Sequence, residues 1–519
     1  MVHQNKQANR IGLIDVGSNT IRLVIFEIDA VNSFREILNI KNPARLAQYL
    51  DGTMMSDQGV DLLIDILKNY ADIAKLYQIK QLIPIATAAI RQSDNAIRIL
   101  QRVKEETGID LELLSEKKEA YYGNYAVRHT LPIQDGISID IGGGSTELTL
   151  FKDKQVRASH SFPFGTVSLK QHFFQNKDHN DAKAIKKASK WVADQFQEFP
   201  WLKDCQVPLI GIGGSARNIA EVYQHQEDYP LAGIHGYSMD QAGLDQVFRT
   251  FAETSFKDLS DLDGLSSDRR DIIIPATLVF LELFKAMDAT AFVVSSYGIR
   301  EGLIIEYINQ LPYHPYSLHF IQQQTVYRMA KQYRMMDLPA SQRMNIMSRL
   351  LDVLADLDIL HPSILDVEFA HFGAALYYLG KVIEDKAESQ HTFYLISNTN
   401  LKGFTHKDRV KLALIASYKN KSLFHQYTKS TSDWFTQDEL DMILCLGSLA
   451  KFAEALNDSH VNTVENIDLE KGKEGYNLTV RYKGNIIAER YRAEKQRNHL
   501  ERVIGDKVDI HFIDAQDDQ

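Results

Sequence analysis

Two stretches of the 519-residue sequence decide the fold, DVGSNTIRLVIF at residues 15–26 and DIGGGSTELTLF at residues 140–151. They align without gaps, so that Asp15 falls on Asp140, and an apolar segment precedes each aspartate. The other matched pairs are Gly17 and Gly142, Leu23 and Leu148, and Phe26 and Phe151. A match at constant offset indicates that one supersecondary unit occurs twice in the chain.

Each copy predicts a β-hairpin whose turn is suited to bind an anion. An apolar strand ends in Asp, and a Gly/Ser/Asn turn leads into a second strand with β-branched residues. Because glycine has no Cβ and adopts positive φ, successive backbone N–H groups of such a turn can converge on a phosphate. The turn residues expected to contact phosphate are Gly17, Ser18 and Asn19 in the first copy and Gly143, Gly144 and Ser145 in the second.

A third glycine loop, GIGGS at residues 211–215, follows the apolar residues 207–210 and precedes a helical pattern at residues 216–223. In this arrangement the backbone donors and the helix dipole both favour a phosphate. The expected contacts are Gly213, Gly214 and Ser215. The sequence therefore predicts a cleft lined by three anion-binding turns from two halves of duplicated architecture.

Together these motifs resemble the exopolyphosphatase and guanosine pentaphosphate phosphatase (Ppx/GppA) family, in the superfamily of actin, Hsp70-type ATPases and sugar kinases. Further matching segments occur in the family's order: ATAAIRQSDN (86–95), SEKKEAYYG (115–123), FPFGTVSLK (162–170), LSSDRRDIIIPA (265–276) and SSYGIREGL (295–303). The resemblance implies an α/β fold of two actin-like (ribonuclease H-like) half-domains, followed by an all-helical, degenerate HD-like domain and a small α+β cap.

The domain boundaries follow from changes in sequence character. After the segment LPYHPYS, long amphipathic patterns without glycine turns predict helices, and the last residues alternate as strands around a helix rich in Lys and Arg. That basic helix could guide a polyanion or present an ordinary solvated face. The predicted domains are residues 1–122, 123–312, 313–460 and 461–519.

Four acidic residues are candidates for the chemistry. Considered alone, Asp140 and Glu147 could bring oxygen ligands to one hard cation, or could be a turn-capping aspartate and a solvent-facing glutamate. The resemblance implies that Asp140 and Glu147 bind the metal, and that Asp15 holds it through water or supports the first turn. It also implies that Glu119 is the catalytic general base and a further metal contact.

One departure from the family pattern adjoins this base. The family commonly reads EEA where this chain has Lys118 before Glu119. A positive charge at this position could lower the pKa of Glu119 or contact the substrate.

Arginine side chains are the expected substrate ligands. A guanidinium at Arg91, after a predicted strand, could bind phosphate oxygens with two hydrogen bonds, although a helix-surface arginine is the plain alternative. The resemblance favours Arg91 as a ligand and suggests Arg22, Arg269 and Arg300 as further anion contacts. Ser145, Asn19 and Ser215 could add donors or simply stabilise their turns.

The predicted helical domain lacks the metal ligands of HD phosphohydrolases. The chain reads YYLG at residues 377–380 where an HD pair would stand, and SYKNK at residues 417–421 where RYHRK-like segments are common. His371, His391 and His406 form no recognisable ligand spacing. We expect this domain to serve structure, dimerisation or polyphosphate tracking.

Composition excludes several classes of protein. No run approaches the roughly 18 apolar residues of a membrane span, and the polar start lacks a secretory signal, so a cytoplasmic location is expected. Cys205 and Cys445 are far apart and indicate neither disulfide nor thiolate metal site. The net charge of -10, with both signs interspersed, argues against a nucleic-acid binder.

The leading functional hypothesis is a metal-dependent exopolyphosphatase that releases orthophosphate from inorganic polyphosphate. Hydrolysis of guanosine pentaphosphate (pppGpp) would use the same residues on another leaving group. A kinase or chaperone of the superfamily and a non-catalytic polyphosphate or alarmone sensor are the remaining alternatives. The resemblance implies Mg²⁺ or Mn²⁺, a monovalent cation such as K⁺, and a homodimer.

Overall fold

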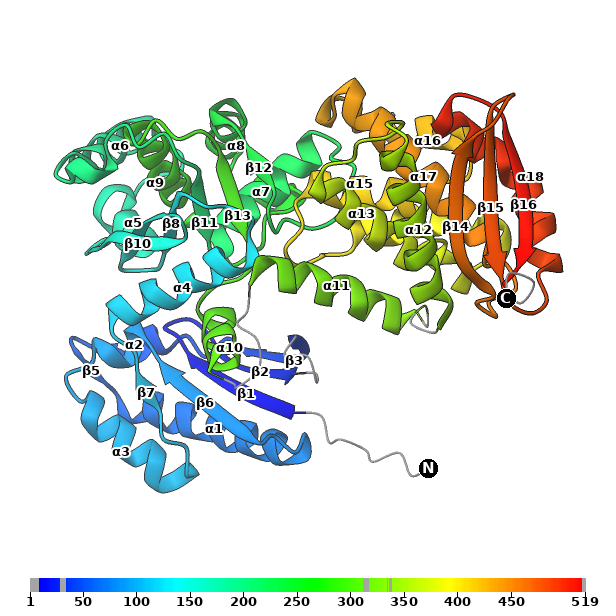
Figure 1. Ribbon diagram of the computed structural model, residues 1–519. Coiled ribbons are helices and arrows are strands. Elements are labelled where there is room, and N and C mark those ends of the chain that lie inside the picture. Colours follow the sequence, from blue (N-terminus) through cyan, green and yellow to red (C-terminus); the bar gives the residue numbers. More distant parts are fainter. Residues whose placement is uncertain (1–8, 29–33, 311–316, 334, 336–337, 516–519) are drawn as a thin grey trace. The chain divides into compact units, whose positions relative to one another are not determined.

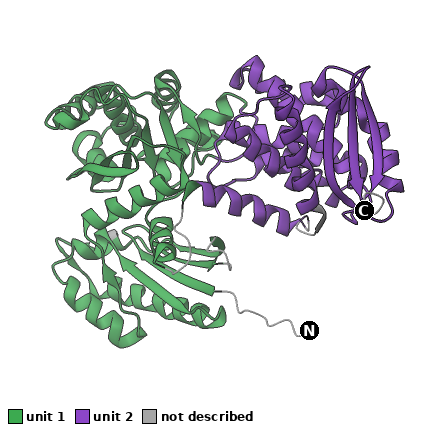
Figure 2. Cartoon of the chain, viewed as in Figure 1, with its two compact units in different colours: residues 1–228, 234–318 green, residues 229–233, 319–519 purple. Residues whose placement is uncertain are grey.

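The computed structural model describes residues 9–28, 34–310, 317–333, 335 and 338–515. The chain forms two compact units, residues 1–228 with 234–318 and residues 229–233 with 319–519 (Figure 2). The predicted boundary at residues 312/313 lies outside the described residues, and the four predicted domain ranges stay predictions.

The first unit contains two mixed sheets, and the N-terminal one has strand order β3-β2-β1-β6-β7 (Figure 1). Strands β1, β2 and β3 are antiparallel, and β6 and β7 run parallel to β1. Its strands are β1 Asn9–Val16, β2 Ile21–Ile28, β3 Phe34–Asn42, β6 Gln81–Ala86 and β7 Glu112–Leu113, and a separate short ribbon pairs β4 Leu50–Asp51 with β5 Met54–Met55.

The second sheet repeats this plan, with order β10-β9-β8-β11-β13-β12. Strands β8, β9 and β10 are antiparallel, β11 and β13 run parallel to β8, and β12 is an antiparallel edge strand. The bounds are β8 Gly136–Ile141, β9 Thr146–Lys152, β10 Gln155–Phe162, β11 Leu209–Ile212, β12 Ser238–Met239 and β13 Phe292–Ser295. The duplicated hairpins are therefore β1–β2 and β8–β9, which confirms the predicted two-lobed α/β architecture.

Helices cover both sheets. The first-unit helices are α1 Asp57–Leu76, α2 Ala88–Arg91, α3 Ala96–Thr107, α4 Glu116–Thr130, α5 Thr166–Phe174, α6 Ala182–Gln197, α7 Gly214–Gln226, α8 Gln241–Glu253, α9 Ile273–Ala286 and α10 Ile299–Asn309, with 3-10 turns at Leu46–Tyr49, Pro200–Leu202 and Asp258–Asp261. The central strands are buried on both faces, as in β1 and β2, whose Leu13, Ile14 and Val24 are fully buried. Each such side chain contributes about 1.5–3 kcal/mol on burial, so the strands that carry the site turns are firmly held.

Helix α4 connects the two sheets of the first unit, because it follows β7 and precedes β8. Ser115 caps its N-terminus and accepts from the Lys118 backbone N–H at 3.3 Å. Helix α10 packs along α4, as Figure 1 shows between the two sheets. A Cβ on Gly302 would overlap the carbonyl oxygen of Tyr122, so this close crossing requires glycine.

The second unit is helical and ends in a small three-stranded sheet, as predicted. Its elements are α11 Leu318–Gln332, α12 Leu338–Asp356, α13 Ile364–Ala375, α14 Glu388–Asn398, α15 His406–Ala416, α16 Lys421–Thr428, α17 Gln437–Ala455, β14 Val464–Lys471, β15 Tyr476–Tyr482, α18 Ile487–Ile504 and β16 Val508–Asp514, with 3-10 turns at Leu379–Val382, Asp385–Ala387 and Ser432–Trp434. Strand β15 lies between antiparallel β14 and parallel β16. Leu449, Leu478 and Leu500 belong to one apolar core, so the sheet and the helices share it.

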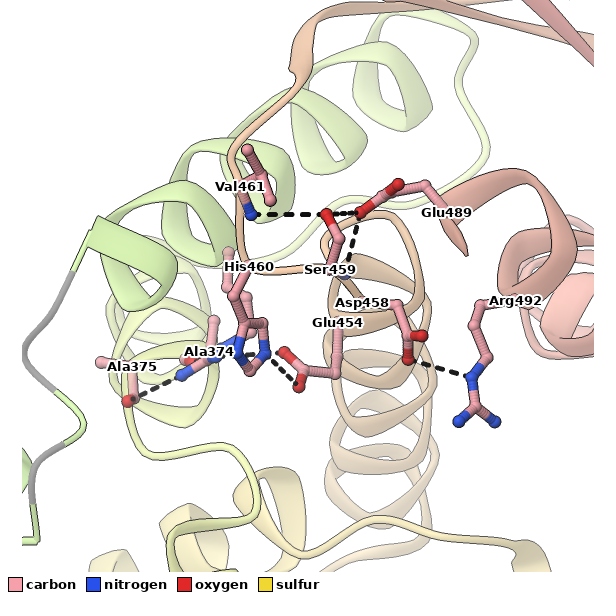
Figure 3. Close-up of polar contacts among 10 residues, drawn as sticks. Ala374, Ala375, Glu454, Asp458, Ser459, His460, Val461, Glu489 and Arg492 are labelled. Carbon is pink, nitrogen blue, oxygen red and sulfur yellow. Dashed lines mark hydrogen bonds and ion pairs between the residues drawn. The ribbon is translucent and has the colours of Figure 1, made fainter. Parts of the chain in front are cut away.

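A buried arginine of α12 contacts Ala374, Ala375 and Glu454, three residues labelled in Figure 3. The Arg343 side chain is only 3% exposed and forms an ion pair of 3.0 Å with Glu454. It also donates to the carbonyl oxygens of Ala374 at 2.9 Å and Ala375 at 3.4 Å. These carbonyl groups lie at the C-terminus of α13, where the last carbonyl oxygens of a helix have no N–H donor within the helix. Arg343 therefore both caps α13 and pairs with the charge of Glu454.

Candidate functional site

The two hairpins place acidic residues at equivalent positions of their strands. In register, Asp15 of β1 lies opposite Arg22 of β2, and Asp140 of β8 lies opposite Glu147 of β9. Burial raises the pKa of Asp15 and of Asp140, and the negative charge of Asp15 raises that of Asp140 further. The two aspartates of the repeat therefore belong to one electrostatic environment.

Glu119 joins this environment from the first turn of α4. Burial raises the pKa of Glu119 to about 7, Arg91 opposes the rise, and Asp140 and Asp15 add to it. A carboxyl group with a pKa near neutrality can accept a proton from water and release it again.

Glu147 completes the group of four acidic residues. Burial raises its pKa to about 8, the Ser145 and Ser161 hydroxyls lower it, and the charges of Asp140 and Glu119 raise it. The Ser161 hydroxyl donates to Glu147 at 3.1 Å. The structure thus brings together the four acidic residues that the sequence singled out.

Arg91 of α2 holds Glu119 in place. One guanidinium nitrogen, Nη1, donates to the Glu119 carboxylate and to the carbonyl oxygen of Leu114 at 2.8 Å. Glu116 lies 3.7 Å away as a second, more exposed partner. Arg91 is therefore no free helix-surface arginine, because its side chain is 17% exposed and fixes the predicted base.

Four further arginines surround the acidic group. After burial, Arg300 and Arg22 are the strongest influences on the pKa of Asp15, and both lower it. Arg217 and Arg269 act on Asp140 in the same way. Burial lowers the pKa of Arg217, and the charges of Arg300, Arg269 and Arg22 lower it further. A cluster of cations that repel one another is suited to a substrate with several negative charges.

Sequence reasoning did not select Arg217. It lies in the first turn of α7, directly behind the glycine loop at residues 211–215. An arginine at that helix N-terminus is the signal that could have identified it. Glu301, 5% exposed, was also missed, and it accepts from the Gly298 N–H at 2.8 Å and raises the pKa of Asp15.

Two donors at this site lack hydrogen-bond partners within the part of the chain that the structure describes. They are Nη1 of Arg300 and the hydroxyl of Ser215, and both atoms are buried. A buried donor without a partner costs roughly 1–3 kcal/mol, so each of these two groups would gain from binding an anion.

Backbone hydrogen bonds close the two hairpin turns, whose glycines do not have the positive φ expected from the sequence, and only the third loop packs closely on a side chain. In the hairpin turns, the Gly17 N–H donates to Thr20 O at 3.0 Å, and the Gly142 N–H donates to Ser145 O at 2.9 Å. A Cβ on Gly214 would lie 2.8 Å from the Arg269 guanidinium, which therefore packs directly on the third loop.

The remaining turn residues fall on three converging segments. Gly213 has φ +94°, and a Cβ there would lie 3.2 Å from Asp140 Oδ1. A Cβ on Gly144 would lie 3.8 Å from the Gln92 side chain, next to Arg91. Ser18, Asn19 and Gly143 lie in the hairpin turns between β1 and β2 and between β8 and β9. The loops thus approach the acidic group from both sheets of the first unit.

The family models for the Ppx/GppA phosphatase family and for Ppx/GppA phosphatase, domain III match residues 24–311 and 321–495. The chain belongs to the Ppx/GppA phosphatase family.

Individual relatives agree with this assignment. Exopolyphosphatase 1 of Mycobacterium bovis is 26% identical over 310 residues, 57% of this chain and 87% of that one. A guanosine-5'-triphosphate,3'-diphosphate pyrophosphatase of Photobacterium profundum is 23% identical and covers 77% of this chain and 78% of that one. A bifunctional 3-dehydroquinate synthase/phosphatase of Fusobacterium nucleatum is 28% identical over 56% of this chain, which spans only 46% of that protein.

A solved structure supports the fold of the first unit. The crystal structure of the Aquifex aeolicus Ppx/GppA family member is 26% identical, covers 58% of this chain and 98% of that chain, and superposes with a TM-score of 0.53. The predicted family, its fold and the assignment as a phosphoanhydride hydrolase are thereby confirmed.

Lys118 of this Ppx/GppA chain pairs with an acidic residue of β7, and its expected contact with substrate stays a prediction. Its ammonium group forms an ion pair with Glu112 and is not among the largest influences on the pKa of Glu119. The pKa of Glu119 is raised because burial outweighs the influences that lower it, of which Arg91 is the largest. The Lys118 side chain, in the first turn of α4, points to the Glu112 carboxylate of β7.

The YYLG segment at residues 377–380 lies in the helical unit of this Ppx/GppA protein, and the HD-like character of that unit stays a prediction. The hydroxyls of Tyr377 and Tyr378 both donate to Tyr418 O, at 2.7 and 3.3 Å. Among the described residues no three His, Cys, Asp or Glu side chains form a group that could hold a metal ion by themselves. No helix in the described ranges has the length and apolar content to cross a bilayer.

Proposed function

We propose that this protein is an exopolyphosphatase, which hydrolyses the terminal phosphoanhydride of inorganic polyphosphate and releases orthophosphate. The observation that carries the proposal is Glu119, a buried carboxyl group that Arg91 holds by a hydrogen bond and whose pKa burial raises to about 7. Arg300 and Ser215 add buried donors without partners among the described residues. This arrangement combines a base of suitable pKa with binding groups for an oxyanion.

In the proposed reaction, Glu119 accepts a proton from water while the water oxygen attacks the terminal phosphorus. The new P–O bond forms as the bond to the bridging oxygen breaks, and the electron pair stays on the shortened chain. Arg217, Arg269 and Arg300 stabilise the charge on the phosphate oxygens, and Glu119 then loses its proton to solvent. The reaction consumes one water and yields orthophosphate and a polyphosphate chain shorter by one phosphate, so it needs no further reactant.

The acidic residues suit a divalent cation such as Mg²⁺ or Mn²⁺. Burial and mutual repulsion raise the pKa of Asp140 and Glu147, so a cation would relieve a real electrostatic penalty. Among the described residues, no three His, Cys, Asp or Glu side chains form a metal-binding group. We therefore expect Asp140 and Glu147 to supply few direct ligands, with water and substrate oxygens completing the coordination of Mg²⁺. When bound, such an ion would neutralise charge on the phosphate oxygens.

A second candidate is hydrolysis of pppGpp at its 5'-phosphate. The pyrophosphatase relative from Photobacterium profundum supports it, since that similarity extends over 77% of this chain. The arginine cluster suits either substrate, because both present successive phosphates. The two reactions differ only in the leaving group.

The test compares both substrates with the purified protein and Mg²⁺. We expect phosphate release from polyphosphate with the higher kcat/KM, and a loss of at least ~100-fold in kcat for Glu119→Gln. Glu105→Gln, an exposed glutamate of α3, is the matched control and should retain full activity. Binding of polyphosphate without phosphate release would instead identify a sensor, and preferred turnover of pppGpp would select the second candidate.

A further inference from the structure

Two consecutive tyrosines of α4 share one carboxylate of α10. The Tyr121 hydroxyl donates to Oε1 of Glu306 and the Tyr122 hydroxyl donates to Oε2, both at 3.0 Å. Each carboxylate oxygen thus receives one hydroxyl. Neighbouring residues on a helix point about 100° apart, so a single acceptor between both tyrosines fixes the rotation of α4 as well as its distance from α10.

Contacts continue on both sides of this carboxylate. One turn earlier on α10, Gly302 lies against the backbone of Tyr122 with no room for a side chain. One turn later, Asn309 donates to the Tyr125 hydroxyl at 2.6 Å. Residues at i, i+4 and i+7 lie on one face of a helix, so Gly302, Glu306 and Asn309 form a continuous seam with α4.

The seam lies close to the reacting groups. Tyr122 follows Glu119 by three residues, about one turn of α4, and Gly302 follows Arg300 by two residues in the first turn of α10. A rotation or slide of α4 on α10 would therefore change the distance between the Glu119 carboxylate and the Arg300 guanidinium. Glu306 itself lies more than a turn of α10 beyond Arg300.

We propose that Glu306 is a positioning residue, which through Tyr121 and Tyr122 holds the general base Glu119 in register with the phosphate bound by Arg300. This role rests on the proposed phosphohydrolase function. Glu306 makes no contact with substrate in this role, so its loss should lower kcat and leave KM nearly unchanged. The expected loss is about ten-fold or more, because small displacements of a catalytic group have large effects on rate.

A double-mutant cycle with Glu119 tests this coupling. Glu306→Ala should reduce kcat in the wild-type background and cause no further reduction in the Glu119→Gln background, where no base remains to be positioned. Glu306→Gln keeps an acceptor oxygen and should restore part of the rate. Glu282→Ala is the matched control, since Glu282 also accepts from a hydroxyl, that of Ser189 at 2.9 Å, but lies on α9. An equal reduction in both backgrounds would overturn the proposal.

Hydrogen exchange of α4 gives a reading that does not need activity. Glu306→Ala should accelerate amide exchange across the first two turns of α4, and Glu282→Ala should not. Unchanged exchange in α4 of Glu306→Ala would also overturn the proposal. If the wild-type protein released no phosphate from either substrate, the proposed function would fail, while the exchange experiment would still decide whether Glu306 holds the helix.

Discussion

Replacing Arg91 should displace the pH dependence of catalysis toward alkaline pH. Arg91 is the strongest influence that lowers the pKa of Glu119, which is nevertheless raised to about 7 by burial. An adjacent guanidinium typically lowers a carboxyl pKa by ~1–3 units, so Arg91→Met should raise the pKa of Glu119 by about that amount. Since the reaction needs the carboxylate, the ionised fraction at pH 7 should fall from about one half to between about a tenth and a thousandth.

The assay is kcat as a function of pH at saturating substrate and constant Mg²⁺. Arg91→Met should lose activity at neutral pH and regain it in alkaline solution. Glu116→Gln is the matched control, because Glu116 contacts the same arginine only at 3.7 Å and is 47% exposed. A variant whose kcat is uniformly lower, with an unmoved acid limb, would refute the reasoning and leave Arg91 as a substrate ligand alone.

Further predictions concern the glycine loop and the second unit. Gly214→Ala should push away the end of the flexible Arg269 side chain, so kcat/KM should fall about 10-fold or more with little change in melting temperature; an unchanged kcat/KM would contradict this. Arg343→Met should lower the free energy of unfolding in urea by about 1–3 kcal/mol, because the Ala374 carbonyl oxygen loses its donor while Glu454, 26% exposed, keeps its contact with His460. Burial lowers the pKa of His499 from 6.5 to about 4, with Lys451 and Arg502 contributing. The unfolded chain therefore takes up the proton more readily, and stability should decrease by about 3 kcal/mol as pH falls from 6.5 to 4. His499→Gln should show a smaller decrease over that interval, and identical acid sensitivity would exclude His499 as its source.

The sequence predicted those features that depend on neighbours along the chain. The gapless match between residues 15–26 and 140–151 predicted both hairpins, because alternation, β-branched residues and glycine turns are local signals. It also placed Asp15 and Asp140 at equivalent strand ends. The helical segment and the terminal small sheet were predicted for the same reason, from periodicity alone.

The tertiary structure alone decided which side chains meet. The Arg91–Glu119 ion pair joins α2 to α4, Arg217 reaches Asp140 from α7, and Glu306 holds α4 from a residue more than 180 positions later in the chain. Lys118 turned to Glu112 although Glu119 is its neighbour in sequence. Local sequence patterns determine the conformation of a segment. Which charged side chains pair depends on how the helices and sheets pack, because burial of their apolar faces sets the direction in which each polar side chain points.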